Sequence, residues 1–129
     1  MSDNSGSSGS SPASVARGYF DAVAAASRAQ LRALLADDAE LVSINAGFMR
    51  GAEEIADYYE ENFFAAGARL RPKTGPLIVH GDVVAVEVQA RSENGKVSWL
   101  SDFFTVRNGL IQSLNVYYGP VLEGGETQV

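Results

Sequence analysis

The spacing of apolar residues changes from a helical period to a strand period near Gly67. Before that point the spacing predicts three helices. The first runs from Val15 to about Ala26, and the second is short, carries Leu31 to Leu35 and ends at the sequence ADDA, residues 36–39. The third covers residues 52–64 and has two glutamates in its first turn, where they favour the helix dipole.

The remaining segments alternate between apolar and polar residues, which predicts strands. A short strand is expected over residues 40–44, followed by a loop between Gly47 and Gly51. After Gly67, four long strands are expected over residues 69–79, 83–91, 97–106 and 110–118, joined by hairpin turns. Helices followed by a strand meander predict an α+β fold in which three N-terminal helices pack on one face of a mostly antiparallel sheet.

Composition limits the organisation to a single domain. The chain has 129 residues, of which 46% are hydrophobic, enough for one core. We expect a flexible Ser/Gly-rich tail over residues 1–14, a folded domain over residues 15–120 and a C-terminal tail over residues 121–129. No apolar run approaches the length of a membrane span, so we expect no membrane association and a cytoplasmic location.

Charge and residue usage narrow the possible partners. The net charge is −6 and the basic residues are scattered, so nucleic acid is not an expected partner. The small basic group of Arg69, Arg71 and Lys73 has the alternation of a solvent-exposed strand face. The chain has no cysteine and a single histidine, His80, so we expect neither thiolate chemistry nor a metal site. No cofactor is expected either.

One acidic residue stands out because it lies within an apolar strand. Leu100, Asp102 and Phe104 share one face of the strand over residues 97–106. An ionised carboxylate on an apolar face is unfavourable by several kcal/mol unless it is paired, hydrogen-bonded or protonated. Asp102 is therefore the first candidate for a functional residue.

The order of elements and three segments resemble a known superfamily. The segments are YFDAVAAASRAQLRALLADDAELV, RGAEEIADYYEENF and DFFTVRNGLIQSLNVYYGP. They are similar to segments of the fold shared by nuclear transport factor 2, ketosteroid isomerase and the polyketide-cyclase-like, or SnoaL-like, proteins. The resemblance covers about residues 15–120. It implies a cone-shaped NTF2-like or cystatin-like roll, whose curved sheet encloses an apolar pocket for a small molecule.

The resemblance also implies roles for individual residues. Tyr19 matches the oxyanion-hole tyrosine of the ketosteroid isomerases, and Asp102 matches the aspartic acid that shares that oxyanion hole. Tyr59 matches a tyrosine that hydrogen-bonds the oxyanion tyrosine from behind in some members. In this comparison Asp102 is a cavity acid that stays neutral and donates a hydrogen bond to a developing oxyanion.

The position of the general base departs from the isomerase pattern. It falls on Ser43, whose hydroxyl does not accept a proton at neutral pH without a neighbouring base. Two hypotheses therefore stay open. The chain is either a ketosteroid isomerase-like or polyketide cyclase-like enzyme that uses Asp102 as its acid/base, or a non-catalytic ligand-binding or protein-interaction module of the same fold.

The alternation of residues along the strands and the family resemblance together predict which other residues contact a ligand. Besides Asp102, Tyr19 and Tyr59, we expect a small apolar ligand to contact Ser43, Asn45, Phe63, Val86, Leu100, Phe104, Leu114, Val116 and Tyr118. The opposite face of the sheet combines Trp99, Phe103, Ile111 and Tyr117 with Glu87 and Gln89. Because this face is too apolar to stay exposed to water, we expect a homodimer formed through it.

Overall fold

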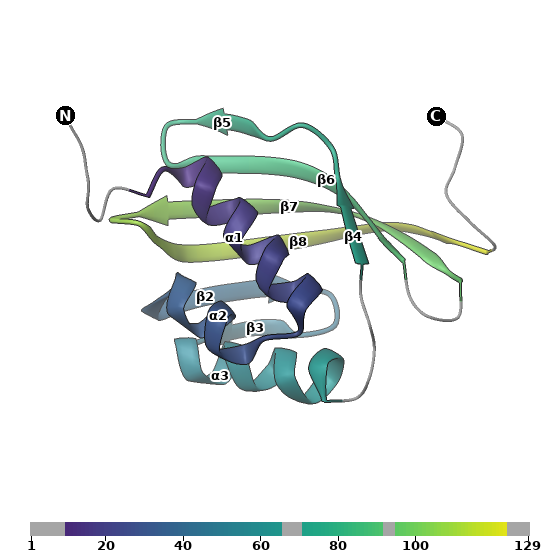
Figure 1. Cartoon of the computed structure of the whole chain (residues 1–129), viewed down its shortest axis with the longest axis horizontal. Coiled ribbons are helices and arrows are strands. Elements are labelled where there is room, and N and C mark those ends of the chain that lie inside the picture. The colour runs from purple at the N-terminus through teal and green to yellow at the C-terminus, as the bar shows by residue number, and fades with distance from the viewer. Residues whose placement is uncertain (1–9, 66–70, 92–94, 124–129) are drawn as a thin grey trace.

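The computed structural model describes residues 10–65, 71–91 and 95–123 (Figure 1). Its helices are α1 (Pro12–Ala25), α2 (Arg28–Leu34) and α3 (Ala52–Tyr59), and α3 continues into a π-helical turn, η1 (Glu60–Phe64). The strands are β2 (Leu35–Ser43), β3 (Gly47–Arg50), β4 (Arg71–Thr74), β5 (Ile78–His80), β6 (Val83–Arg91), β7 (Val97–Arg107) and β8 (Leu110–Leu122). Within the described residues no helix is long and apolar enough to span a bilayer.

The strands form one open, mostly antiparallel sheet in the order β3-β2-β8-β7-β6-β4, and β5 also pairs with β6. Strand β2 runs parallel to β8. In β6 and β7 the even-numbered residues face inward, so Val84, Val86 and Phe104 are buried while Phe103 is exposed. The predicted α+β architecture with helices on one face is confirmed (Figure 1).

The helices cover one face of the sheet because each has an apolar stripe. Ser11 caps the N-terminus of helix α1: its side chain accepts a hydrogen bond from the Ser14 amide at 3.1 Å, and Pro12 occupies the first turn. Its buried stripe includes Tyr19 and Phe20 and packs against β4, β6 and β7. Helix α3 packs against β2 and β3. The core therefore lies between the helices and the inner sheet face.

The start of the sheet differs from the prediction. Strand β2 begins at Leu35 rather than residue 40, so the sequence ADDA lies in the strand instead of ending α2. Asp37 and Asp38 are both exposed, and the β2–β8 register shifts between Leu35 and Glu40. This bulge lets the chain enter the sheet directly from the helix. The expected loop from Gly47 to Gly51 contains the edge strand β3.

The strand expected over residues 69–79 is divided into β4 and β5. After Gly75 donates its amide to the Glu87 carbonyl at 2.9 Å, Pro76 has no amide hydrogen with which to continue the ladder. Arg69 lies outside the described residues. The ends of the domain also extend further than expected, since α1 begins at Pro12 and β8 runs to Leu122.

One residue changes face because of a second bulge. Ile111 was expected on the outer face of the sheet, but it is fully buried in the core. The β7–β8 register shifts between Thr105 and Val106, so Ile111 pairs with the inward-facing Val106. Beyond such a shift, the alternation of residues along a strand no longer predicts the face of each side chain, because the extra residue exchanges the inner and outer positions.

Candidate functional site

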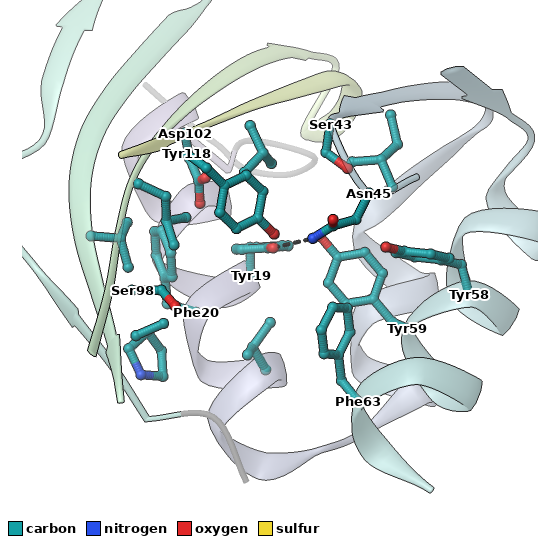
Figure 2. A pocket seen from close by; sticks show the side chains of 17 residues that line it. Tyr19, Phe20, Ser43, Asn45, Tyr58, Tyr59, Phe63, Ser98, Asp102 and Tyr118 are labelled. Carbon is teal, nitrogen blue, oxygen red and sulfur yellow. Dashed lines mark hydrogen bonds between the residues drawn. The ribbon is translucent and has the colours of Figure 1, made fainter. Parts of the chain in front are cut away.

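A pocket of about 240 Å³ opens between the helices and the inner sheet face (Figure 2). Helix α1 and the α3–η1 segment form one wall, and the sheet forms the other. The lining side chains are Tyr19, Phe20, Val23, Leu41, Ser43, Asn45, Tyr58, Tyr59, Phe63, Pro72, Val88, Ala90, Ser98, Leu100, Asp102, Val116 and Tyr118. Most of this surface is aromatic or aliphatic, with a few polar groups, as is typical of small-molecule sites.

The π-helical turn positions aromatic side chains at this wall. The Ala65 amide donates to the Glu60 carbonyl at 2.7 Å, five residues earlier, which widens the helix at this point. The ring of Phe63 packs on that of Tyr59 with centroids 5.5 Å apart. The predicted helix over residues 52–64 is thus confirmed, with its last turn adapted to hold a ring at the pocket.

Two buried phenols meet inside the pocket. The hydroxyl oxygens of Tyr19 on α1 and Tyr59 on α3 lie 2.6 Å apart and share a hydrogen bond (Figure 2). Burial raises the pKa of both phenols well above the ordinary value, so both keep their protons near neutral pH. One of the two hydroxyl hydrogens makes the shared bond, and the other is left to donate to a ligand.

Asp102 on β7 is the only acidic side chain that lines the pocket within residues 10–65, 71–91 and 95–123. It is 1% exposed, and its Oδ1 atom is buried without a hydrogen-bond partner. Because burial penalises the charged form, the pKa of Asp102 rises to about 7. The carboxyl group is therefore substantially protonated near neutral pH and can act as a hydrogen-bond donor or acceptor.

Two further polar side chains approach the same region from β8 and from the turn between β2 and β3. Figure 2 shows Tyr118 and Asn45 with their polar ends directed toward the Tyr19–Tyr59 pair. Burial raises the pKa of the half-exposed Tyr118, and a hydrogen bond with Asn45 partly offsets this effect. The pocket thus gathers several of its polar groups near Asp102 and the phenols.

Ser43, at the position of the isomerase base, has a structural task. Its Oγ atom accepts a hydrogen bond from the Ala46 amide at 2.9 Å and so holds the turn between β2 and β3. The side chain is 8% exposed and lines the pocket. Because the oxygen already accepts from the backbone, its hydroxyl hydrogen is free to donate, so Ser43 offers a ligand a donor rather than a base.

Three carboxylates on α3 and β2 are engaged outside the pocket. Asp57 and Glu53 accept hydrogen bonds from Arg28 on the outside of the helices, at 2.8 Å each. Glu40 pairs with Arg50 on β3. None of these side chains lines the pocket. Within the part of the chain that the structure describes, no three histidine, aspartate or glutamate side chains gather as a metal site would require.

The predicted contact residues divide into two groups. Tyr19, Ser43, Asn45, Tyr59, Phe63, Leu100, Asp102, Val116 and Tyr118 line the pocket. Val86, Phe104 and Leu114 do not, and they lie in the core at 3% exposure or less. The rings of Tyr19 and Phe20 pack against Phe104, with centroids 5.1 and 5.8 Å apart, and fill the space above it.

Several lining residues were missing from the predicted set. Val88, Ala90 and Ser98 have the parity of the expected inner face, so strand alternation could have identified them. Tyr58 lines the pocket together with its neighbour Tyr59, although adjacent helical residues usually diverge. No sequence pattern indicated that Pro72 lines the pocket, because its position depends on the division of the predicted strand into β4 and β5.

The packed helices and the open curved sheet define an NTF2-like, cystatin-like fold, which solved structures of proteins with no known function share. The model of the SnoaL-like domain family matches residues 16–114, and the chain belongs to this family. None of the curated proteins matches the chain significantly.

Enzyme-like proteins are among the similar solved structures. A Kribbella flavida protein, provisionally described as a ketosteroid isomerase, has a TM-score of 0.74 and 18% identity over 90% of this chain and 83% of its own. An epoxide hydrolase/cyclase-like enzyme involved in pyran ring formation in the polyether salinomycin has a TM-score of 0.74 and 19% identity, covering 84% and 90%. A Sinorhizobium meliloti protein, provisionally described as a polyketide cyclase, has a TM-score of 0.70 and 21% identity, covering 79% and 92%. At these identities the likeness establishes the fold.

Proposed function

We propose that this protein binds a small apolar carbonyl or enol compound and acts on it by acid–base chemistry, with Asp102 and Tyr19 as the catalytic residues. The observation that carries the proposal is the buried Asp102 carboxyl with an unpartnered oxygen, in the same pocket as the Tyr19–Tyr59 pair. Similar structures described as isomerase-like and cyclase-like support this class of chemistry. The remaining lining residues hold the apolar part of the ligand.

The two groups have complementary tasks in such a reaction. Either hydroxyl of the Tyr19–Tyr59 pair can donate the shared hydrogen bond. When Tyr59 donates to Tyr19, the Tyr19 hydrogen is left for the substrate oxygen and is strengthened as a donor. Protonated Asp102 donates to the same oxygen and can transfer its proton as negative charge develops there. Since Ser43 offers no base, the Asp102 carboxylate that remains after this transfer must itself take up a proton from the substrate, which favours cyclase-like over steroid isomerase chemistry.

The alternative is a non-catalytic binding module of the same fold, and it is favoured because the described part of the chain supplies no second carboxylate to the pocket. An enolisation needs a group to remove a proton from carbon while a donor stabilises the oxygen. Asp102 cannot perform both tasks at the same moment. Under this alternative the pocket recognises a carbonyl oxygen without turning the compound over.

Binding of 2-acetonaphthone tests both possibilities, because its carbonyl oxygen only accepts hydrogen bonds and its methyl hydrogens exchange on enolisation. We expect this ketone to bind more tightly than 2-ethylnaphthalene, which lacks the oxygen. Tyr19→Phe and Asp102→Leu should each weaken ketone binding about tenfold, the value of one hydrogen bond of about 1.4 kcal/mol, because neither replacement can donate to the oxygen. Asp102→Asn, in contrast, keeps a donor and removes only the proton that can be transferred. Calorimetric titration measures the affinities, and NMR in D₂O measures exchange of the methyl hydrogens.

Tyr117→Phe is the matched control, because Tyr117 lies on the outer face of the sheet and does not line the pocket. Exchange that disappears in Asp102→Asn would support the enzyme. Binding without exchange would support the binding module. Equal affinity for the ketone and the hydrocarbon would exclude Tyr19 and Asp102 as an oxygen-binding pair.

We further propose that two copies of the chain associate through the outer sheet face. One row of neighbouring positions crosses this face from edge to edge: Phe48, Val42, Asn115, Phe103, Ala85 and Ile78. Phe48, Phe103 and Ile78 are 63%, 42% and 67% exposed, and the row carries no charge. Two copies of a chain with net charge −6 repel each other, so an uncharged contact row suits a second copy.

Phe103→Glu is expected to convert a dimer into a monomer, because it places two carboxylates at the centre of the contact. Light scattering at micromolar concentration measures the mass. Ala24→Glu adds the same charge on the exposed side of α1 and should leave the mass unchanged. A monomeric wild-type protein would refute this association.

A further inference from the structure

The charge content of the pocket favours a second class of ligand. Among the described residues that line it, Asp102 is the one acid, and no lysine, arginine or histidine is present. We propose that the pocket also binds a small apolar amine as its ammonium ion, paired with the carboxylate of Asp102. This inference concerns binding alone and does not require that the protein turn over a carbonyl compound.

The carboxyl group of Asp102 is prepared for such a partner. Its Oδ1 atom is buried without a hydrogen bond, so a polar ligand atom would displace no protein group from it. The side chain is already desolvated in the ligand-free protein, at 1% exposure. An incoming ammonium ion therefore loses its own hydration but need not dehydrate its partner, which removes part of the desolvation cost of a buried ion pair.

Aromatic rings surround the pocket on the helical side and at β8. Six of the lining side chains are aromatic: Tyr19, Phe20, Tyr58, Tyr59, Phe63 and Tyr118. Their mutual contacts hold them in place, with centroids 5.9 Å apart for Tyr58–Tyr59 and 6.0 Å for Tyr19–Tyr59. Rings attract a nearby cation through their negative faces and accept its apolar substituents, so they suit an organic ammonium ion better than an inorganic one.

Protonation of Asp102 selects between the two ligand classes. A ketone oxygen needs the protonated acid as a donor, whereas an ammonium ion needs the carboxylate. The ionisable groups that face Asp102 are Tyr19 from α1, Tyr59 from α3 and Tyr118 from β8, while β6 contributes the apolar Val86 as its strand neighbour. Burial raises the pKa of all three phenols, so Asp102 is the group that changes charge near neutral pH.

The test compares 2-(aminomethyl)naphthalene with 2-naphthylmethanol, which have nearly the same shape but differ in charge. At about pH 8 we expect the amine to bind at least about tenfold more tightly than the alcohol, the effect of one charge-assisted hydrogen bond. Acidification to about pH 5.5 should weaken amine binding about 30-fold, as expected for one acid with a pKa of about 7. Calorimetric titration over this range measures both compounds.

Asp102→Asn should abolish the preference for the amine and its pH dependence. Asp21→Asn removes the same charge from the exposed side of α1, outside the pocket, and should retain both. If the amine binds no better than the alcohol at about pH 8, or if Asp102→Asn keeps the preference, the proposal is wrong. Because 2-acetonaphthone binding should instead weaken as the pH rises, failure of one proposal is distinguishable from failure of the other.

Discussion

The free energy of unfolding is expected to fall by on the order of 4 kcal/mol between about pH 4 and about pH 7 because of Asp102 alone. In the unfolded chain this carboxyl loses its proton near its ordinary pKa of about 3.9. In the folded protein it keeps the proton until the pH approaches about 7. The folded state therefore binds more protons throughout this interval, so stability decreases as the pH rises and levels off above it.

Asp102→Asn should remove this contribution, because an amide has the same shape but does not ionise. Urea unfolding of both proteins across the pH interval measures the effect, and the difference between the two curves cancels the other titrating groups, such as the paired Glu53. At about pH 8 the variant should be the more stable protein. Parallel curves for wild type and variant would contradict the raised pKa.

Asp21→Asn is the control for a general charge effect, since Asp21 is exposed on α1. It should not reproduce the effect of Asp102→Asn. A gain in stability on replacing Asp102 would mean that the folded protein retains a destabilising group in its pocket. This behaviour is typical of residues kept for function rather than for folding.

Phe104→Ala is expected to reduce the free energy of unfolding by about 3–5 kcal/mol. Phe104 is fully buried, and its ring packs against those of Tyr19 and Phe20 with centroids 5.1 and 5.8 Å apart. Removing the ring loses its burial and leaves a cavity between α1 and β7 that the neighbouring strands cannot close. Urea unfolding at a single pH measures the change.

Leu100→Ala is the matched comparison, because Leu100 lies two residues earlier on the same face of β7 but borders the pocket and is only partly buried. It should destabilise the protein less, since the space it leaves joins an existing opening. If Leu100→Ala reduced the free energy of unfolding more than Phe104→Ala does, Leu100 would belong to the core and Phe104 would border the pocket, contrary to the structure.

Strand alternation identified the correct face for most pocket residues but not their position along the sheet. Asp102, Leu100 and Phe104 have the same parity, and all three face inward. Only the first two border the pocket, because the rings of α1 cover Phe104. Where a helix crosses a sheet depends on the packing of distant segments, which local periodicity does not contain.

Register shifts between paired strands caused the other wrong predictions. The bulge near Thr105 turned Ile111 inward, and the bulge after Leu35 placed ADDA in a strand. An extra residue on one strand inverts the parity of everything beyond it, and few sequence signals mark where this happens. The division of the strand over residues 69–79 was easier to predict from the sequence, because Pro76 has no amide hydrogen with which to continue the hydrogen bonds between strands.

The sequence by itself determined the α+β class, the faces of the long strands and the choice of Asp102 as the residue most in need of an explanation. These features depend on local periodicity and on the unfavourable free energy of a carboxylate on an apolar face. Only the tertiary structure decided that Asp102 has an unpartnered oxygen, that Tyr19 bonds Tyr59 at 2.6 Å, and that Ser43 is occupied by a turn. Each of these depends on distances between residues far apart in the chain, or on a turn geometry that no local pattern specifies.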